Sequence, residues 1–408
     1  MVETKLLYPL YTLTSAAEHH STRFERPTAI GAFNVNFYSQ AVGILKGLEI
    51  ARAPGIIQAS KGACDFQGSP LEIQKMTLSA MKDLNHEYPI CLHLDHGNKD
   101  SCLQCIYSGF SSVMIDASTK KREEIRNGNK VIIEEKTPLE ENIEATKEIV
   151  KAAHKSGISV EGEIGVLRGK EGDKESSVEI YASPEEIFEY GIRSKLDIIA
   201  PACGTCHGPI KEFKKLEEGL LEGARQMFYE EGIEMPFCLH GSSTIPPEMV
   251  AEFMKYGGKI KKASGVPMSA IKRAIELGVR KVNIDSDLRM GITTVFRKYF
   301  QEHQGIQNTN EILKGIYDIL YGNKEAKDPK SGKILVNAEV LDPRVYLVDV
   351  PKELLRKSPK GSCLEEVMSL VEAQVSNHVA SLVYQFGSVG LTIDRGLTLE
   401  AMASKYNK

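Results

Sequence analysis

The chain has 408 residues, of which 42% are hydrophobic and 26% charged. These proportions are those of an ordinary globular protein and exclude a disordered, collagenous or fibrous chain. The 51 Lys and Arg residues against 55 Asp and Glu residues give a net charge of −4. Such a balance provides no chain-wide basic field for nucleic acid or anionic lipid, so any anion must be bound by a local pocket.

The N-terminal segment and the cysteine content favour a cytoplasmic protein. The first residues lack a basic leader, and Pro9 interrupts their short apolar stretch, which is not typical of a secretory signal peptide. No run approaches the roughly 18 apolar residues of a membrane span. Eight cysteines are too sparse for a disulfide scaffold. We therefore expect a cytoplasmic protein with neither a membrane nor a nucleic-acid partner.

Short β-branched apolar runs alternate with longer amphipathic segments from about residue 29 to residue 300. The near-continuous apolar character of the runs predicts parallel strands covered on both faces. Eight such units predict a (β/α)8 barrel, with an open doubly wound sheet as the alternative. The predicted strands are 29–35, 55–60, 89–95, 112–118, 159–165, 196–204, 236–242 and 281–287.

Helical patterns lie between these strands, among them 41–53, 71–84 and 139–157. The stretch Ser183-Pro184-Glu185-Glu186 has the pattern of a capping box with proline in the first turn, which predicts a helix start.

Two segments depart from the alternation. The stretch 119–136 carries dense mixed charge around Asn127-Gly128, which predicts a solvated β-hairpin inserted after the fourth strand. The region after about residue 304 contains further helical patterns. We expect a catalytic barrel over 1–303, with its insertion at 119–137, and a helical extension over 304–408 that packs on the barrel or on a neighbouring subunit.

Polar residues follow the predicted strands where each apolar run ends. In a barrel these carboxyl ends converge on one face, where active sites are built, so the polar residues predict a single site. They are Asn34, Ser60, Asp95, His96, Asp116, Glu161, Glu163, His207, His240 to Ser243, Asn283, Asp285 and Asp287.

Three of these strand-end residues are histidines, each followed by glycine: His96, His207 and His240. Three imidazoles with an open position form the ligand set of a catalytic zinc site. The glycines let the backbone approach the site and leave amides available for an anion. A single histidine at a strand end is often structural, but three on converging ends predict a metal site.

Each carboxylate at the strand ends has two possible interpretations. Asp95 directly precedes His96, so their side chains would point to opposite faces unless the strand end twists. Asp95 is either an acid/base group or a residue that orients a histidine ligand. Glu161 and Glu163 share a face, as do Asp285 and Asp287. Each pair is either functional or occupied in helix caps and ion pairs.

Two further patterns concern cysteine and glycine. Cys102-x-x-Cys105 and Cys203-x-x-Cys206 lie too far apart for a zinc ribbon and lack a thioredoxin-like context, so we expect core or loop thiols. Stretches 204–208, 240–243 and 283–286 place glycine or small hydroxyl residues at late strand ends, where this fold commonly binds phosphate. Tight βα turns are the alternative interpretation.

Together these motifs make the chain similar to the class II, zinc-dependent fructose-1,6-bisphosphate aldolases, nearer to the longer members of that family. The matching stretches occur in family order: GAFNVN (31–36), HLDHG (93–97), GFSSVMIDAS (109–118), VEGEIG (160–165), YASPEEI (181–187), GTCHG (204–208), LHGSS (239–243) and GVRKVNIDSDLRMGIT (278–293).

The resemblance implies a role for each matching residue. It implies catalytic Zn2+ ligands at His96, His207 and His240, and an alternative or second divalent site at Asp116 and Glu163. Proton transfer is implied for Asp95 and for Glu171, whose loop has lost one glycine and the adjacent acid of the family motif. The implied substrate and phosphate contacts, with a K+ or Na+ ion nearby, are Asn34, Ser60, Gly208, Gly241, Ser243, Asn283, Asp285, Ser286 and Arg344.

By the same resemblance we expect a lyase of glycolysis and gluconeogenesis that acts as a homodimer or higher homo-oligomer. It would cleave fructose 1,6-bisphosphate to dihydroxyacetone phosphate and glyceraldehyde 3-phosphate, and run the reverse condensation, through a zinc-stabilised enediolate. Tagatose-1,6-bisphosphate, which differs in the stereochemistry of one hydroxyl, is the alternative substrate. The three histidines are also compatible with a zinc hydrolase, and the barrel with a non-catalytic protein that serves binding.

Overall fold

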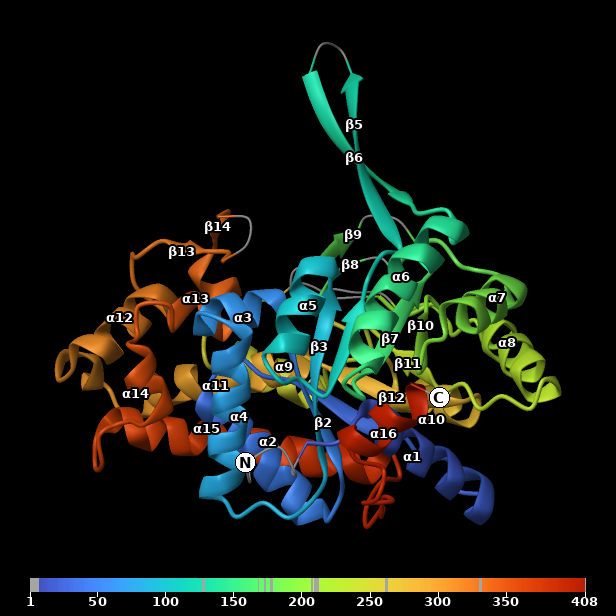
Figure 1. Ribbon diagram of the computed structural model, residues 1–408. Coiled ribbons are helices and arrows are strands. Elements are labelled where there is room, and N and C mark those ends of the chain that lie inside the picture. The colour runs from blue at the N-terminus through green and yellow to red at the C-terminus, as the bar shows by residue number, and fades with distance from the viewer. Residues whose placement is uncertain are drawn as a thin grey trace.

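The computed structural model describes residues 7–407 apart from 127–128, 168, 172–173, 177–178, 207, 209–212, 261–262 and 330–331, and gives only the backbone for the rest of 121–134 and 168–178. Eight strands close into a barrel in the order β1-β12-β11-β10-β7-β4-β3-β2 (Figure 1). All neighbours pair in parallel. The predicted (β/α)8 barrel is therefore confirmed, and the open-sheet alternative is wrong. The strands are β1 (Ile30–Asn34), β2 (Gly55–Ser60), β3 (Ile90–Gly97), β4 (Ser112–Ile115), β7 (Ser159–Ile164), β10 (Ile198–Pro201), β11 (Phe237–Leu239) and β12 (Val279–Ile284).

Four strands end three residues earlier than predicted, and β1 and β7 end one residue earlier. β4 ends at Ile115, β10 at Pro201, β11 at Leu239 and β12 at Ile284. The last of these differences arises because Asp285 is already the N-cap of a helix that begins at Ser286. Many of the predicted polar residues therefore lie on the loops just beyond the strands, where side chains and backbone amides both face the mouth of the barrel.

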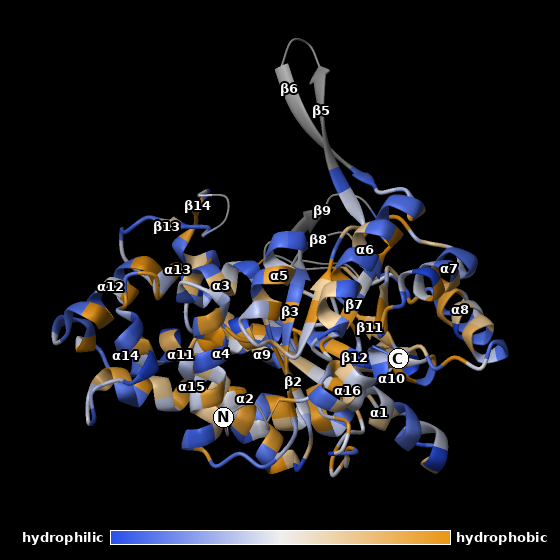
Figure 2. Ribbon diagram, viewed as in Figure 1, coloured by the Kyte–Doolittle hydropathy of each residue, from blue (hydrophilic) through white to orange (hydrophobic). Residues whose placement is uncertain are grey.

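The outer helices cover the barrel and carry both hydrophobic and hydrophilic residues (Figure 2). The capping box predicted at Ser183 is present, because its hydroxyl accepts from the Glu186 amide while the Glu186 carboxylate accepts from the Ser183 amide. The outer helices are α2 (Tyr38–Ala51), α3 (Lys61–Gln67), α4 (Pro70–Asp83), α5 (Lys99–Tyr107), α6 (Leu139–His154), α7 (Pro184–Ser194), α8 (Glu218–Glu230), α9 (Pro247–Lys255), α10 (Met268–Glu276) and α11 (Ser286–Glu302).

The interior of the barrel is apolar at one end only. Helix α1 (Leu10–Phe24) inserts Leu10 and Leu13 into a buried cluster with strand residues such as Ile56 and Ile198. This cluster closes the amino ends of the strands. The charged and imidazole side chains of the predicted site lie toward the other end of the strands.

Two hairpins extend from the carboxyl side of the strands. β5 (Thr119–Arg126) and β6 (Asn129–Lys136) pair antiparallel, with Thr119 opposite Lys136, and rise well above the body in Figure 1. The predicted hairpin is confirmed, although its turn residues Asn127 and Gly128 lie outside the described residues. β8 (Gly169–Glu171) and β9 (Lys174–Ser176) form a smaller hairpin after β7.

The C-terminal region packs against the barrel helices. Its long helix α15 (Cys363–Gln385) lies along α2 (Figure 1), where a Cβ atom added to Gly43 or Gly47 would lie 2.7 Å from the Cβ of Val375 or Val379. Glycine thus permits a close approach of the two helices. The other elements are η2 (Ile306–Asn308), α12 (Glu311–Leu320), β13 (Ala326–Lys327), β14 (Ile334–Leu335), η3 (Asn337–Glu339), α13 (Pro343–Tyr346), α14 (Lys352–Arg356) and α16 (Leu399–Tyr406).

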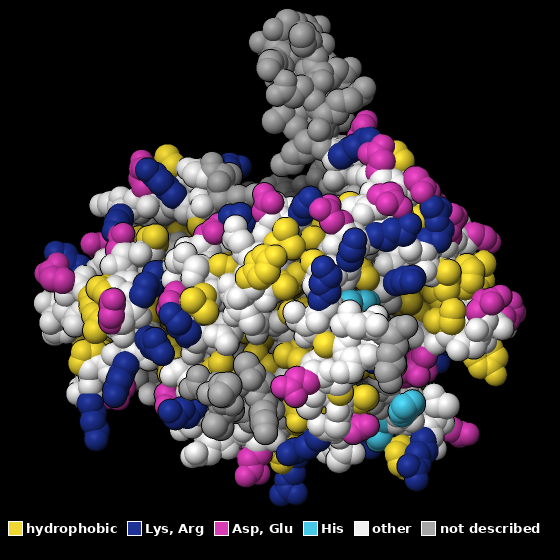
Figure 3. Space-filling view, in the orientation of Figure 1, with side chains coloured by type: hydrophobic (Ala, Val, Ile, Leu, Met, Phe, Trp, Pro, Cys, Tyr) yellow, Lys and Arg dark blue, Asp and Glu magenta, His cyan; other side chains and the backbone are white. Residues whose placement is uncertain are grey.

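The charge distribution on the surface and the polarity of the helices agree with what the composition indicates. On the face shown in Figure 3, basic and acidic side chains are interspersed, and hydrophobic side chains occur in small groups. Within the described residues, no helix combines the length and the apolar character that crossing a membrane requires.

Candidate active site

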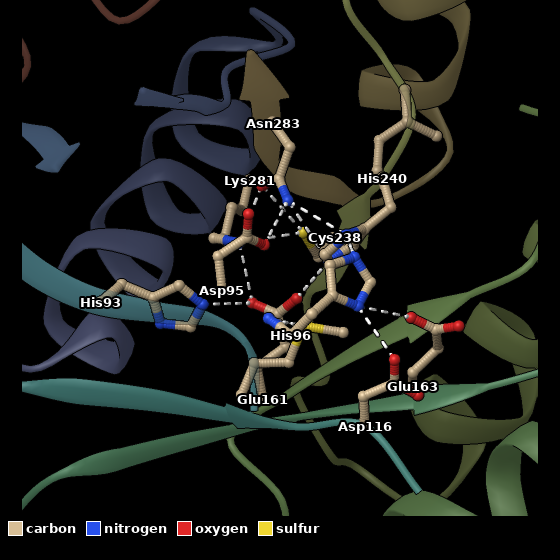
Figure 4. Close-up of polar contacts among 12 residues, drawn as sticks. His93, Asp95, His96, Asp116, Glu161, Glu163, Cys238, His240, Lys281 and Asn283 are labelled. Carbon is tan, nitrogen blue, oxygen red and sulfur yellow. Dashed lines mark hydrogen bonds and ion pairs between the residues drawn. The ribbon is translucent and has the colours of Figure 1, made fainter. Parts of the chain in front are cut away.

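Polar side chains from opposite sides of the barrel meet at the carboxyl ends of the strands (Figure 4). The Nε2 atom of His96, on β3, lies 3.1 Å from the Nδ1 atom of His240, which directly follows β11. Asp95, His96 and His240 each offer one potential metal-ligand atom, and these three atoms lie within 4.8 Å of one another. Three residues predicted from the sequence are thus brought together in one group that has the geometry to hold a metal ion.

The twist required to bring Asp95 and His96 to one pocket is present. His96 has a φ of 52°, in the left-handed region that residues other than glycine seldom adopt. This conformation turns the end of β3, so that two consecutive side chains reach the same space rather than opposite faces of the strand.

The other ring nitrogen of His96 faces Asp116 and Glu163, the two carboxylates predicted to form an alternative or second metal site. Its Nδ1 atom lies 3.0 Å from Asp116 Oδ2 and 3.4 Å from Glu163 Oε2. Ser118 Oγ lies 2.8 Å from Asp116 Oδ1 and 3.2 Å from Glu163 Oε1. Because an ionised carboxylate only accepts hydrogen bonds, Nδ1 carries the proton and the lone pair of Nε2 faces His240.

A buried ion-pair network fixes the orientation of the His240 ring. His240 Nε2 donates to Glu161 Oε1 at 2.7 Å, and Glu161 Oε2 lies 3.0 Å from Lys281 Nζ and 3.4 Å from His93 Nε2. Glu161 and Lys281 are completely buried. Burial alone would raise the pKa of the Glu161 carboxyl, but Lys281 and His240 hold this pKa well below its usual range. The Nδ1 atom of His240 is therefore an acceptor, and it lies 3.1 Å from both His96 Nε2 and the amide nitrogen of Asn283.

Asp95 is held by two side-chain amides. Its Oδ2 atom accepts from Asn34 Nδ2 at 2.9 Å, and its Oδ1 atom accepts from Asn283 Nδ2 at 3.4 Å. Asn34 in turn accepts from Gln58 at 2.7 Å. Two residues predicted to lie beside the substrate thus also orient the predicted acid/base carboxylate. Ser60 lies opposite Asp95 in the β2–β3 register and caps α3 by accepting from the Ala63 amide at 3.3 Å.

The loops that follow the late strands are tied to one another. Ser243 Oγ accepts from the backbone amides of Asp285 and Ser286, at 3.1 and 3.0 Å, at the N-terminus of α11. A helix N-terminus of this kind also offers donors to an anion. Gly241 has a φ of 59°, and an added Cβ would lie 2.6 Å from the Cys206 carbonyl oxygen, so glycine is required there. Gly208 also has a positive φ, of 90°.

Two arginines gather around one carboxylate beside these loops. Asp342 lies 2.7 Å from Arg289 and 2.8 Å from Arg344, and Arg289 also pairs with Asp285 at 2.7 Å. Burial raises the pKa of Asp342, but the two guanidinium groups outweigh it and lower the pKa to about 2. The predicted Arg344 is thus connected, through Asp342 and Arg289, to the predicted Asp285.

Several predicted residues are not placed, and several contacts were not predicted. His207 lies outside the described residues; Glu171 ends β8, and its side chain is not described. Lys281, Arg289 and Gln58 were not predicted from the sequence as parts of the site. A lysine within the apolar run of β12 is the one signal that called for a buried partner, because a lone buried charge is costly.

The cysteines bear out the interpretation as core or loop thiols. In the described part of the chain, which includes all eight, no disulfide is formed, and seven cysteines are buried. Cys102 and Cys105 lie in α5 rather than in a metal-binding knuckle. Cys238 lies beside Glu161 and His240 in a second group with metal-ligand spacing.

Comparison with known proteins agrees with this geometry. The family model described as fructose-bisphosphate aldolase class II matches residues 15–349. A fructose-bisphosphate aldolase of Giardia intestinalis is 38% identical over 67% of this chain and 79% of its own length. One from Rhizobium meliloti is 31% identical over 86% of this chain and 96% of its own.

Solved structures share the fold at lower identity. An aldolase of Escherichia coli K12 has a TM-score of 0.58 at 21% identity and covers 94% of this chain and 98% of its own. A fructose-bisphosphate aldolase of Campylobacter jejuni has a TM-score of 0.57 at 18% identity and covers 95% of this chain and 97% of its own. With the family match over residues 15–349 and the curated relatives, the conclusion is that this chain is a lyase that belongs to the class II fructose-bisphosphate aldolase family.

Proposed function

We propose that the protein is a zinc-dependent enzyme that cleaves fructose 1,6-bisphosphate to dihydroxyacetone phosphate and glyceraldehyde 3-phosphate and catalyses the reverse condensation. The observation that carries this proposal is the 3.1 Å approach of His96 Nε2 and His240 Nδ1 beside the buried Asp95. The relatives from Giardia intestinalis and Rhizobium meliloti, which are named fructose-bisphosphate aldolases, support the choice of substrate.

The donor set fits a divalent cation. Carboxylates occupy Nδ1 of His96 and Nε2 of His240, so the two remaining ring nitrogens face one another as acceptors. A cation removes the repulsion between two such lone pairs, and carboxylate-oriented imidazoles are typical zinc ligands. His207 is the third proposed ligand, and Asp116 with Glu163 form the proposed second position. A bound ion would supply Lewis-acid stabilisation of the negative charge that develops on the ketone oxygen.

Asp95 and Glu171 are the proposed proton carriers. In cleavage, Asp95 takes the proton of the C4 hydroxyl as the bond between C3 and C4 breaks and the C4 aldehyde forms. The electron pair stays on C3, which Glu171 then protonates to give dihydroxyacetone phosphate. The contacts of Asp95 with Asn34 and Asn283 support its role, because they fix the carboxylate beside the imidazoles. Condensation runs the same steps in reverse.

The loops that follow the late strands are the proposed binding sites for the substrate phosphates. The small residues Gly208, Gly241, Ser243 and Ser286, with Asp285, would surround one phosphate, and Arg344 would pair with the other. The ties of Ser243 to the amides at the start of α11 support the first assignment. Asn283 is assigned to the substrate carbonyl, and Asn34 and Ser60 to the substrate side of the pocket.

The remaining expectations complete the proposal. The enzyme would act in glycolysis and gluconeogenesis in the cytoplasm, as a homo-oligomer, with a K+ or Na+ ion near the phosphate site. Residues 1–303 would form the catalytic barrel domain and 304–408 an extension of it. Sedimentation of a monomer at micromolar concentration would contradict the expected oligomer.

The test is cleavage of fructose 1,6-bisphosphate before chelation, after chelation and after Zn2+ is restored, with a mock-dialysed sample as the control. We expect activity to disappear with the chelator and to return with zinc. Tagatose 1,6-bisphosphate is assayed in parallel, and faster turnover of that epimer would reassign the substrate. If the folded, zinc-loaded protein cleaves neither sugar, the proposal is wrong.

A further inference from the structure

The carboxylate of Asp287 connects the loop after β11 to the C-terminal helix α15. Its Oδ2 atom accepts from the backbone amide and the hydroxyl of Thr244, at 3.1 and 2.7 Å, and its Oδ1 atom accepts from the Ile245 amide at 2.9 Å. His378 Nε2, from α15, lies 3.1 Å from the same Oδ2 atom. Asp287 is completely buried, and the side chain of His378 is 14% exposed.

The loop that Asp287 holds has an unfavourable conformation. Ile245 has a φ of 39°, in the left-handed region, which a β-branched residue rarely adopts. Such a conformation persists only where the surrounding structure imposes it. Asp287 imposes it from one side. From the other side, the Val266 amide donates to the Ser243 carbonyl oxygen at 3.0 Å, and Gly265 packs directly on the Thr244 carbonyl group.

The same loop carries groups of the proposed active site. His240 and Ser243 lie within five residues of Thr244, and Ser243 Oγ accepts from the amides of Asp285 and Ser286. If the Thr244–Ile245 backbone relaxed, Ser243 would move and the amides at the start of α11 would lose their partner. The orientation of the Asp287 carboxylate therefore sets the position of the proposed phosphate loop.

His378 is the donor to this carboxylate that comes from outside the loop. Burial raises the pKa of Asp287, but the hydrogen bond and charge of His378, with the donors of Thr244 and Ile245, lower it below its usual value. His378 also lies beyond residues 15–349, which the family model matches. The C-terminal helix thus reaches a part of the site that the matched region alone does not complete.

We propose that His378 is a positioning residue, which acts through Asp287 to fix the loop that carries Ser243 and thereby sets the affinity for the substrate phosphate. This inference rests on the proposed function and deepens it, because it assigns part of the phosphate affinity to the C-terminal helix. A residue that acts in this way affects binding of the phosphate more than the rate of the chemical step.

The test compares His378→Ala with His378→Gln, whose amide can still donate to Asp287, and with Asn377→Ala, an exposed position on the same helix. KM and kcat are measured with fructose 1,6-bisphosphate, and binding of inorganic phosphate is measured by calorimetry, which requires no turnover. We expect His378→Ala to raise KM and to weaken phosphate binding, each about tenfold, with kcat changed less than about twofold. His378→Gln and Asn377→Ala should resemble the unchanged protein.

Phosphate affinity that is equal in His378→Ala and the unchanged protein overturns the inference, as does a loss confined to kcat. Failure of the unchanged protein to cleave the sugar refutes the proposed function instead, and the calorimetric comparison still decides whether His378 sets the phosphate affinity. If His378→Ala does not fold, His378→Phe keeps the volume of the ring without the donor, and the same loss of affinity is expected.

Discussion

The imidazole rings of His96 and His240 meet edge to face across the mouth of the barrel, with their centroids 4.7 Å apart, although 144 positions separate the residues in the chain. Their strands, β3 and β11, stand on opposite sides of the barrel order. In each ring, the nitrogen that faces away from the other ring contacts a carboxylate. Asp116 and Glu163 contact His96, and Glu161 contacts His240. The space between the rings is thus defined by groups on both sides of the barrel.

Weakening the support of His240 should weaken metal binding. Glu161→Gln removes the charge that fixes the His240 ring, so we expect the affinity for Zn2+ to fall about 10- to 100-fold. Competition with a fluorescent chelator measures this affinity directly. Glu144→Gln, at an exposed helix position that pairs only with Lys147 in the contacts described, is the matched control. An unchanged affinity in Glu161→Gln would show that the ring needs no such support.

Replacing the proposed proton carrier should slow catalysis without loss of metal. Asp95→Asn keeps the size of the side chain but removes its capacity to take a proton, and we expect kcat to fall about 10²- to 10⁴-fold. The zinc content of the purified variant, measured by atomic absorption, should equal that of the unchanged protein. Full activity of Asp95→Asn would exclude this residue as the acid/base group.

The buried lysine of β12 should contribute far more to stability than a surface lysine. Lys281→Met leaves the buried Glu161 charge without its cation, and we expect the free energy of unfolding to fall by about 3 to 5 kcal/mol. Lys46 pairs with Glu372 at 2.8 Å but is 44% exposed. Lys46→Met should therefore cost less than about 1 kcal/mol. Urea denaturation at neutral pH measures both, and similar losses would contradict the assignment.

The carboxylate between the two arginines should make stability depend on acid pH. The pKa of Asp342 is about 2 in the folded protein against an ordinary 3.8, so its contribution is fully present above about pH 4 and is lost as the pH falls toward 2. This shift corresponds to on the order of 2 kcal/mol at neutral pH. Asp342→Asn should be less stable by that order at pH 7, as measured by urea denaturation, and the difference should shrink between pH 4 and pH 2. A constant difference would count against the shift.

The sequence predicted the barrel because eight largely apolar runs alternate with amphipathic helical segments along the chain. It also predicted the group formed by Asp95, His96 and His240, because the carboxyl ends of parallel strands converge. It could not predict the partners of that group. The Lys281–Glu161 and Arg289–Asp342 pairs depend on which strands and loops face one another in the closed barrel, and spacing along the chain carries no information on this.

The pairing of β1 with β12, which places Ala32 beside Asn283, also has a consequence for synthesis. A nascent chain that ends before Val279 already contains both imidazoles, but Glu161 lacks its lysine and Asp95 lacks one of its two amides. The edges of β1 and β11 would also be open to other strands. The pocket can therefore be completed only after β12 has been made, and until then two open strand edges are available for pairing with other chains.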